Sequence, residues 1–193
     1  MEIAVVGTGF IGGILGRALA GAGHDVTFAS RHPDDDKVAE GTAARVAPVA
    51  DAVAGAPVII LALPGGAVSD FVRDNEEALA GKLVIDATNQ AGQPVANARA
   101  ALPAGTRYAR AFNSIGGENM ADPVLAGVQA DMFFSAAESD RPIVETVIAG
   151  VGLKPVFVGP DQEQLVDALF QVWVALAFSQ GHGRRMALKL LEG

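Results

Sequence analysis

The chain has 193 residues, half of them hydrophobic, and its 14 basic and 22 acidic side chains give a formal net charge of −8. This length and composition predict one globular domain that needs no cross-links, and the absence of cysteine excludes disulfides, thiol catalysis and thiolate metal sites. The three histidines are too scattered to predict a bound metal. The acidic balance disfavours nucleic acid and anionic membranes as partners, because both bind positive surfaces.

The most hydrophobic segment, residues 165–178, is too short to cross a bilayer. As a helix it would span about 21 Å, against about 30 Å of hydrocarbon, and it carries Asp167 and Gln171. The residues after Met1 lack the basic region of a signal peptide. We therefore expect a cytoplasmic protein.

Short runs rich in valine, isoleucine and phenylalanine alternate with helical stretches, the pattern typical of a parallel sheet covered by helices on both faces. The predicted strands lie at residues 2–6, 25–29, 44–47, 57–62, 82–87, 107–112, 130–136 and 154–158. The predicted helices lie at residues 10–22, 34–41, 49–54, 66–79, 94–101, 140–150, 161–179 and 183–191. The predicted fold class is α/β, a doubly wound, mostly parallel sheet in residues 1–160 with a helical C-terminal extension in residues 161–193 packed on it.

A G-x-G-x-x-G motif follows the first predicted strand and opens the first predicted helix. It consists of Gly7, Thr8, Gly9, Phe10, Ile11 and Gly12. The first glycine permits a tight turn, the second lets the backbone approach a pyrophosphate, and the third lets helix and strand pack closely. A bound anion would meet the partial positive charge of the helix N-terminus. The motif predicts a Rossmann-type NAD(P)-binding domain, with an ordinary glycine-rich turn as the alternative.

The end of the second predicted strand indicates which dinucleotide binds. Folds specific for NAD usually carry an acid about twenty residues after the motif, where it binds the ribose hydroxyls. Here that corner holds Ser30, Arg31 and His32. Because these three side chains can donate to phosphate oxygens, we predict that they bind the 2′-phosphate of NADP(H). A solvated basic turn is the alternative.

Two more loops leave the carboxyl ends of predicted strands, where ligands bind in open α/β sheets. Leu63 and Pro64 lie in the first loop and offer an apolar wall to the nicotinamide ribose. Asn89 lies in the second and offers an amide to the carboxamide or the ribose. We predict that both loops bind the cofactor, with plain turns as the alternative.

Signatures of other catalytic mechanisms are missing from the sequence. It contains neither a G-x-S-x-G nucleophile elbow nor a P-loop, and its one tyrosine, Tyr108, is followed four residues later by Phe112 instead of a lysine. We therefore predict no catalytic side chain. Hydride transfer to a conjugated ring suits such a chain, because cofactor and acceptor hold the reactivity and the protein mainly stacks two rings.

Residues 110–119 form the predicted loop for this small-molecule acceptor, since they follow a strand and are rich in small and amide side chains. Asn113 and Ser114 can hydrogen-bond the polar edge of a ring, so we predict that they bind the acceptor. The alternative role of both is to cap the strand end and form a turn.

The chain resembles the NADP oxidoreductases that use the deazaflavin coenzyme F420. The resemblance rests on the glycine motif, Ser30-Arg31, Asp86-Ala87-Thr88-Asn89, and residues 111–115, 158–160 and 165–178. It implies an N-terminal Rossmann domain, recognition of the 2′-phosphate at Ser30 and Arg31, and reversible hydride exchange between NADPH and the deazaflavin. Members that use the deazaflavin tend to carry histidine at the position of Asn113 and a proline-containing stretch at residues 116–119. A bacterial subgroup with a different acceptor is therefore the alternative.

The hydrophobic helix predicted near residues 165–178 has almost no polar face, so it needs cover on all sides. We predict a homodimer through this helix, as the family resemblance also implies; complete burial within one chain is the alternative. The predicted function is hydride exchange between NADPH and a deazaflavin- or flavin-like acceptor. A non-catalytic NADP(H)-binding redox sensor and a small carbonyl reductase are the alternatives.

Overall fold

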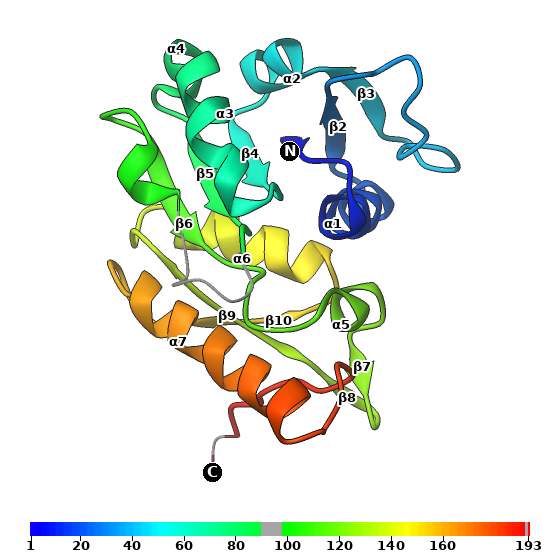
Figure 1. Cartoon of the computed structure of the whole chain (residues 1–193), viewed down its shortest axis with the longest axis vertical. Helices are drawn as coiled ribbons and strands as arrows, with labels where there is room; N and C mark the ends of the chain where they lie inside the picture. Colours follow the sequence, from blue (N-terminus) through cyan, green and yellow to red (C-terminus); the bar gives the residue numbers. More distant parts are fainter. Residues whose placement is uncertain (90–97, 192) are drawn as a thin grey trace. The chain divides into compact units, whose positions relative to one another are not determined.

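A computed structural model describes residues 1–89, 98–191 and 193 (Figure 1). The chain divides into two compact units, Met1–Tyr108 and Ala109–Gly193. The organisation predicted from the sequence, a sheet domain in residues 1–160 with a helical extension in residues 161–193, stays a prediction. The helix that follows residue 160 packs against a strand within residues 109–160.

The first unit contains a parallel sheet. Its strand order is β3 (Arg45–Pro48), β2 (Asp25–Ser30), β1 (Glu2–Val6), β4 (Val58–Leu61) and β5 (Leu83–Asp86). β1 pairs in parallel with both β2 and β4, so that Val6 lies between Ala29 and Leu61. The chain runs from β1 outward to β3 and then returns to β4 on the other side of β1. Open α/β sheets bind ligands at the carboxyl ends of the strands where the order reverses in this way.

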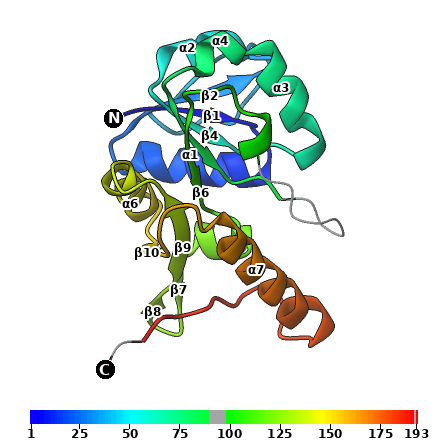
Figure 2. The same ribbon diagram turned by 90° about the vertical axis from the view of Figure 1, so that its left-hand side faces the viewer.

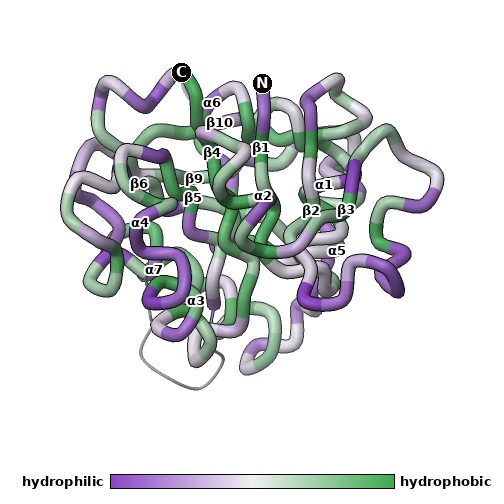
Figure 3. Tube along the Cα trace, turned by 90° about the horizontal axis from the view of Figure 1, so that it is seen from above, coloured by the Kyte–Doolittle hydropathy of each residue, from purple (hydrophilic) through white to green (hydrophobic). Residues whose placement is uncertain are grey.

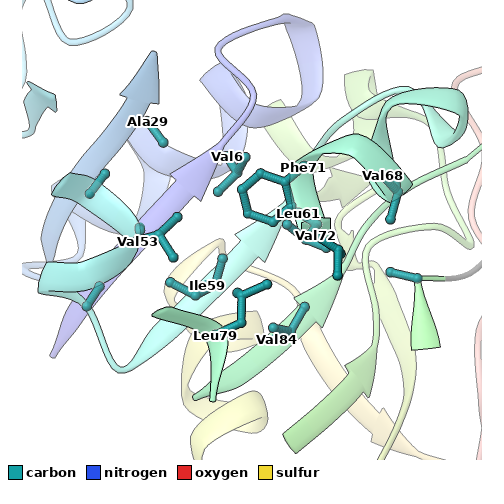
Figure 4. Close-up of a cluster of buried hydrophobic side chains, with 14 residues drawn as sticks. Val6, Ala29, Val53, Ile59, Leu61, Val68, Phe71, Val72, Leu79 and Val84 are labelled. Carbon is teal, nitrogen blue, oxygen red and sulfur yellow. The ribbon is translucent and has the colours of Figure 1, made fainter. Parts of the chain in front are cut away.

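Helices bury the hydrophobic residues of these strands. They are α1 (Phe10–Gly21), α2 (Val49–Gly55), α3 (Val68–Asp74) and α4 (Glu76–Leu79), with the short 3-10 helices η1 (Gly65–Ala67) and η2 (Arg99–Ala101). Figure 4 shows one buried cluster that joins strands to helices; its labelled members are Val6, Ala29, Val53, Ile59, Leu61, Val68, Phe71, Val72, Leu79 and Val84. The hydropathy trace is correspondingly hydrophobic around β1 and β4 (Figure 3). The predicted parallel sheet and its strand positions are confirmed in this unit.

Of the helices predicted in the first unit, one does not form and another is interrupted. Residues 34–41 form turns instead of a helix, because the Asp36 carboxylate accepts the backbone N–H of Val38 and so competes with helical hydrogen bonding. The helix predicted at residues 66–79 is interrupted at Asn75, whose side-chain amide donates to the carbonyl of Phe71 at 2.8 Å. Of the helix predicted at 94–101, residues 94–97 lie outside the described residues.

The second unit begins within β6 (Arg107–Arg110), the strand that crosses the division between the units. The end of β6 pairs in antiparallel fashion with β9 (Asp131–Ala136), and β9 pairs in parallel with β10 (Lys154–Phe157). Both α6 (Arg141–Gly150) and α7 (Glu163–Val174) pack against β9. The remaining elements are α5 (Gly117–Ala121), the hairpin of β7 (Val124–Leu125) and β8 (Val128–Gln129), and a π-helical turn, η3 (Ala175–Ser179).

The helix predicted at residues 183–191 was also wrong. This segment follows α7 as an extended trace (Figure 2). The Asn119 side-chain amide donates to the carbonyls of Arg184 and Met186 at 2.9 and 2.8 Å, and the Asp131 carboxylate accepts the backbone N–H of Leu190 at 2.7 Å. Because these long-range bonds occupy the backbone groups, the segment does not close helical turns.

In the part of the chain that the structure describes, none of the helices combines the length and the hydrophobicity that crossing a membrane requires. The same residues contain no cluster of three side chains suited to a metal ion.

Candidate functional site

The turn between β1 and α1 has two positions that only glycine can occupy. Gly7 has a φ of +106°, and a Cβ atom there would lie 2.5 Å from the carbonyl oxygen of Ala62 and 3.4 Å from the Leu63 side chain. A Cβ atom at Gly12 would lie 1.8 Å from the carbonyl oxygen of Gly7. The first and third glycines of the motif therefore pack the turn against its surroundings, as the motif predicts.

Gly9 has a different environment, because a Cβ atom there would meet no atom within 4 Å. Its carbonyl oxygen accepts the N–H of Gly13 at 2.8 Å at the start of α1. The first turn of α1 carries no acidic side chain, and Phe10 is exposed while Ile11 is partly buried. Open space over the second glycine, next to a helix N-terminus, fits the approach of a dinucleotide pyrophosphate.

Asp36 connects two of the predicted cofactor-binding residues. Its Oδ2 accepts the hydroxyl of Ser30 at 2.9 Å, its Oδ1 accepts the N–H of Val38 at 3.0 Å, and the Thr8 side chain also hydrogen-bonds it. Burial alone would raise the pKa of Asp36, but the hydrogen bonds it accepts outweigh burial and lower this pKa from its ordinary value. The carboxylate is therefore charged at neutral pH. The sequence analysis did not assign Asp36 to the cofactor site.

A pocket of about 500 Å³ lies over the start of α1; it is lined by Thr8, Gly9, Phe10, Gly13, Ile14, Arg17, Asp36, Lys37 and Val38. The motif residues and the segment after β2 thus meet around one hollow. Arg17 and Lys37 supply its basic side chains, and neither residue was predicted. Arg31 and His32 are exposed and do not line this pocket, so their binding of the 2′-phosphate stays a prediction.

The loops after β4 and β5 come together. Pro64 and Asn89 form a parallel bridge just beyond the paired strands. Asp86 fixes the second loop, because its carboxylate accepts the N–H and the hydroxyl of Thr88 at 2.9 and 2.6 Å and the hydroxyl of Tyr108 at 2.8 Å. Sequence reasoning gave Asp86 no role of its own, although an acid that ends a hydrophobic strand is a recognisable signal.

Asn113 and Ser114 belong to the second unit, and both are buried. The Asn113 side-chain amide donates to Oδ1 of Asp167 at 3.0 Å, and the Ser114 hydroxyl lies 3.6 Å from the sulfur of Met132. Asp167 also accepts Nε of Arg110, a fully buried guanidinium, at 2.8 Å. These contacts hold the loop after β6 in place. Binding of the acceptor by Asn113 and Ser114 stays a prediction.

The backbone of the same loop is strained. Phe112 has a φ of +65°, a region that few residues other than glycine adopt, and its N–H donates to the Met132 sulfur at 3.2 Å. Strained backbone of this kind clusters at functional sites. No sequence signal predicted it, because phenylalanine has no intrinsic preference for this conformation.

A parallel sheet that reverses its order beside β1, followed by a glycine turn open at a helix N-terminus, defines a dinucleotide-binding protein of the Rossmann class. Residues 2–90, slightly less than half of the chain, match the family described as NADP oxidoreductase, coenzyme F420-dependent. Over these residues, the match confirms the resemblance to NADP oxidoreductases inferred from the sequence motifs. A comparison with curated proteins gave no match.

Solved structures share the fold. A candidate F420-dependent NADP-reductase from Arthrobacter sp. FB24 is 24% identical with a TM-score of 0.80, and the match covers all of both chains. A hypothetical protein from Sinorhizobium meliloti is 24% identical with a TM-score of 0.72, over 100% of this chain and 96% of that one. A reductive aminase from Aspergillus terreus, in complex with NADPH and ethyl-5-oxohexanoate, is 22% identical with a TM-score of 0.70, over 91% of this chain and 62% of that one. These similarities confirm the predicted Rossmann-type α/β fold.

Proposed function

We propose that this chain exchanges a hydride between NADPH and a deazaflavin- or flavin-like acceptor, with coenzyme F420 as the first candidate. The observation that carries the proposal is the open backbone at Gly9, beside the strand reversal. It lies within the residues that match the coenzyme F420-dependent family. The composition, acidic and free of cysteine, is consistent with action in the cytoplasm.

Residues of the first unit bind and orient the cofactor in this proposal. Bound NADPH would supply the hydride. The backbone at Gly9 and the N-terminus of α1 hold the pyrophosphate, and Ser30, Arg31 and His32 hold the 2′-phosphate. Leu63, Pro64 and Asn89 bind the nicotinamide ribose or the carboxamide from the two bridged loops.

Residues of the second unit hold the acceptor in this proposal. Asn113 and Ser114 bind the polar edge of its ring, and Asp167 is a positioning residue because it fixes the Asn113 amide. We assign no catalytic side chain, since transfer between two conjugated rings depends mainly on their distance and orientation.

We further propose that a second copy of the chain covers α7 and η3. Leu165, Val172 and Phe178 are 52%, 46% and 57% exposed. Leu165 and Val172 are seven residues apart, so they lie on one face of the helix. Within the single chain these side chains remain open to solvent, which supports the proposal. Covering this face in a homodimer would remove it from water.

The proposed function is tested by mixing the purified protein with NADPH and a panel of acceptors: coenzyme F420, flavin mononucleotide, a quinone and an aldehyde. We expect oxidation of NADPH with the deazaflavin or the flavin, and no oxidation with the aldehyde. Tight binding of NADPH without oxidation by any acceptor would favour a redox sensor. Turnover with the aldehyde alone would favour a carbonyl reductase. Either result would contradict the proposal.

A further inference from the structure

Asp36 places a negative charge beside the groups that the proposed function assigns to the cofactor. It lines the pocket over the start of α1 together with Thr8 and Lys37. It is partly buried, and it accepts hydrogen bonds from the Thr8 and Ser30 side chains and from the Val38 backbone. One carboxylate therefore engages both hydroxyls that were predicted to face the cofactor.

The hydroxyl of Ser30 has only one proton. It donates this proton to Oδ2 of Asp36 at 2.9 Å, while its oxygen accepts the N–H of His32 at 3.1 Å. Ser30 can therefore donate to a phosphate oxygen only after its bond to Asp36 breaks. The carboxylate competes with the phosphate for this donor.

The negative charge of Asp36 also disfavours a bound 2′-phosphate. A carboxylate and a phosphate in one pocket repel each other, and partial burial reduces the screening of that repulsion by water. The pocket also contains Arg17 and Lys37, which attract a phosphate. A carboxylate near the ribose can accept its 2′-hydroxyl, which is the role of the acid in folds that bind NAD. Asp36 thus opposes the 2′-phosphate and favours the free hydroxyl.

We propose that Asp36 is a specificity-determining residue of the nucleotide pocket, which lowers the preference of this chain for NADPH over NADH. The inference rests on the proposed function, since it takes the pocket as the place where the adenosine ribose binds. It predicts that the natural chain also binds NADH, and that Asp36 sets how far the two affinities differ.

The test compares Asp36→Asn with the wild type by calorimetric titration of the apoprotein with NADPH and with NADH. Asparagine has nearly the same size, and its one oxygen can still accept the Val38 N–H. Its NH2 group takes the place of Oδ2, so it donates to the Ser30 oxygen and no longer accepts the Ser30 proton. We expect Asp36→Asn to bind NADPH about tenfold more tightly, because repulsion is removed, and to bind NADH equally or more weakly. The matched control is Asp35→Asn, which removes one charge from an exposed neighbour that does not line the pocket; it should leave the ratio of the two affinities unchanged.

Thermal unfolding of each apoprotein shows whether the variants are folded, and Asp36→Ser is a second variant that keeps a hydroxyl to accept the Val38 N–H. An unchanged ratio of affinities in both folded Asp36 variants, or equal changes in both variants and in Asp35→Asn, would overturn this inference while leaving the proposed function intact. A wild type that binds neither nucleotide would overturn both.

Discussion

The three motif glycines of the nucleotide-binding turn carry different constraints. A side chain at Gly7 or Gly12 would collide with backbone oxygens, whereas one at Gly9 would enter open space. Substitution at Gly9 therefore separates ligand binding from folding, which substitution at either of the other two positions cannot do.

We expect Gly9→Ala to fold with an unchanged melting temperature and to bind NADPH about tenfold to a hundredfold more weakly. The added methyl group would occupy the space of the pyrophosphate. It would weaken binding by about the free energy of one charge-assisted hydrogen bond. Differential scanning fluorimetry and calorimetric titration measure the two effects. Gly21→Ala is the control, because Gly21 lies at the other end of α1 and also has open space around it. Unchanged NADPH affinity in Gly9→Ala would contradict the assignment of this turn.

Asp36 should also make the stability of the protein depend on pH. Burial raises its pKa, but the hydrogen bonds that it accepts lower the pKa further, so that the folded value lies below the ordinary 3.8. A lowered pKa means that folding favours the charged form. The resulting stabilisation is complete above pH 3.8 and is lost as the pH falls through the folded pKa.

We therefore expect Asp36→Asn to have a lower melting temperature than the wild type at neutral pH, and the difference to shrink as the pH falls below 3.8. Scanning calorimetry over a pH series measures this difference, with Asp35→Asn as the control for removal of one negative charge. A difference that stays constant at all pH values would show that the Asp36 carboxylate does not titrate with folding.

At the scale of elements, the buried ion pair of Arg110 and Asp167 joins β6 to α7 within the second unit. Arg110 is fully buried, so removal of its partner would leave a charge without compensation in a region of low dielectric. We expect Asp167→Ala to lower the free energy of unfolding by about 3–5 kcal/mol, measured by denaturant titration. The double substitution Arg110→Met with Asp167→Leu should restore part of this loss.

The exposed pair of Arg141 and Glu145 on α6 is the control for this experiment. Glu145→Ala should leave stability almost unchanged, because water screens surface ion pairs. A loss in Asp167→Ala no greater than that in Glu145→Ala would show that the buried pair does not hold α7 in place.

The exposed face of α7 and η3 leads to a prediction about assembly. We expect the wild type to sediment as a dimer whose dissociation depends on concentration. The double substitution Leu165→Gln with Val172→Gln should shift it toward monomer, because the apolar face no longer gains from burial. Leu191→Gln is the control, since Leu191 is exposed but lies outside α7 and η3. A wild type that stays monomeric at all concentrations would rule out the dimer.

The elements that the sequence predicted well are those with strong local signals. Val58–Leu61 and Leu83–Asp86 are short and wholly hydrophobic up to Asp86, and the glycine motif marks the start of α1. The failures in the first unit depend on side-chain hydrogen bonds that the hydrophobic pattern does not report. Residues 34–41 contain good helix formers, but the Asp36 carboxylate accepts the N–H of Val38 and the hydroxyl of Ser30.

The candidate site shows the same limit. The sequence located the glycine turn and both loops that meet at Pro64 and Asn89, because each follows a strand end. It did not identify Asp36 or Lys37 as lining the pocket, since their position depends on how the turns after β2 fold over α1. It also did not predict the pairing of Asp167 with Arg110, which are 57 residues apart.

At the scale of the whole molecule, the proposed roles fall in different units. The residues proposed to bind the cofactor belong to Met1–Tyr108, and those proposed to bind the acceptor belong to Ala109–Gly193. We expect NADPH at a hundred times its Kd to stabilise the protein by about 2.7 kcal/mol, because it binds only the folded state. Hydrogen exchange should slow most in residues 7–13. Protection confined to residues 109–193 would contradict this division of roles. The control is NADPH added to Gly9→Ala, which should slow exchange less because this variant is expected to bind NADPH more weakly.

The extended segment after α7 has a consequence for biosynthesis. Asp131 is fully buried in β9. The Lys189 ammonium group forms an ion pair with its carboxylate, and the backbone N–H of Leu190 donates to the same carboxylate. Both partners lie about sixty residues later in the sequence. A nascent chain still tethered at residue 180 would hold that carboxylate without these partners. The second unit can therefore reach its native state only after Leu190 has emerged from the ribosome, whereas the sheet of the first unit is free to form much sooner.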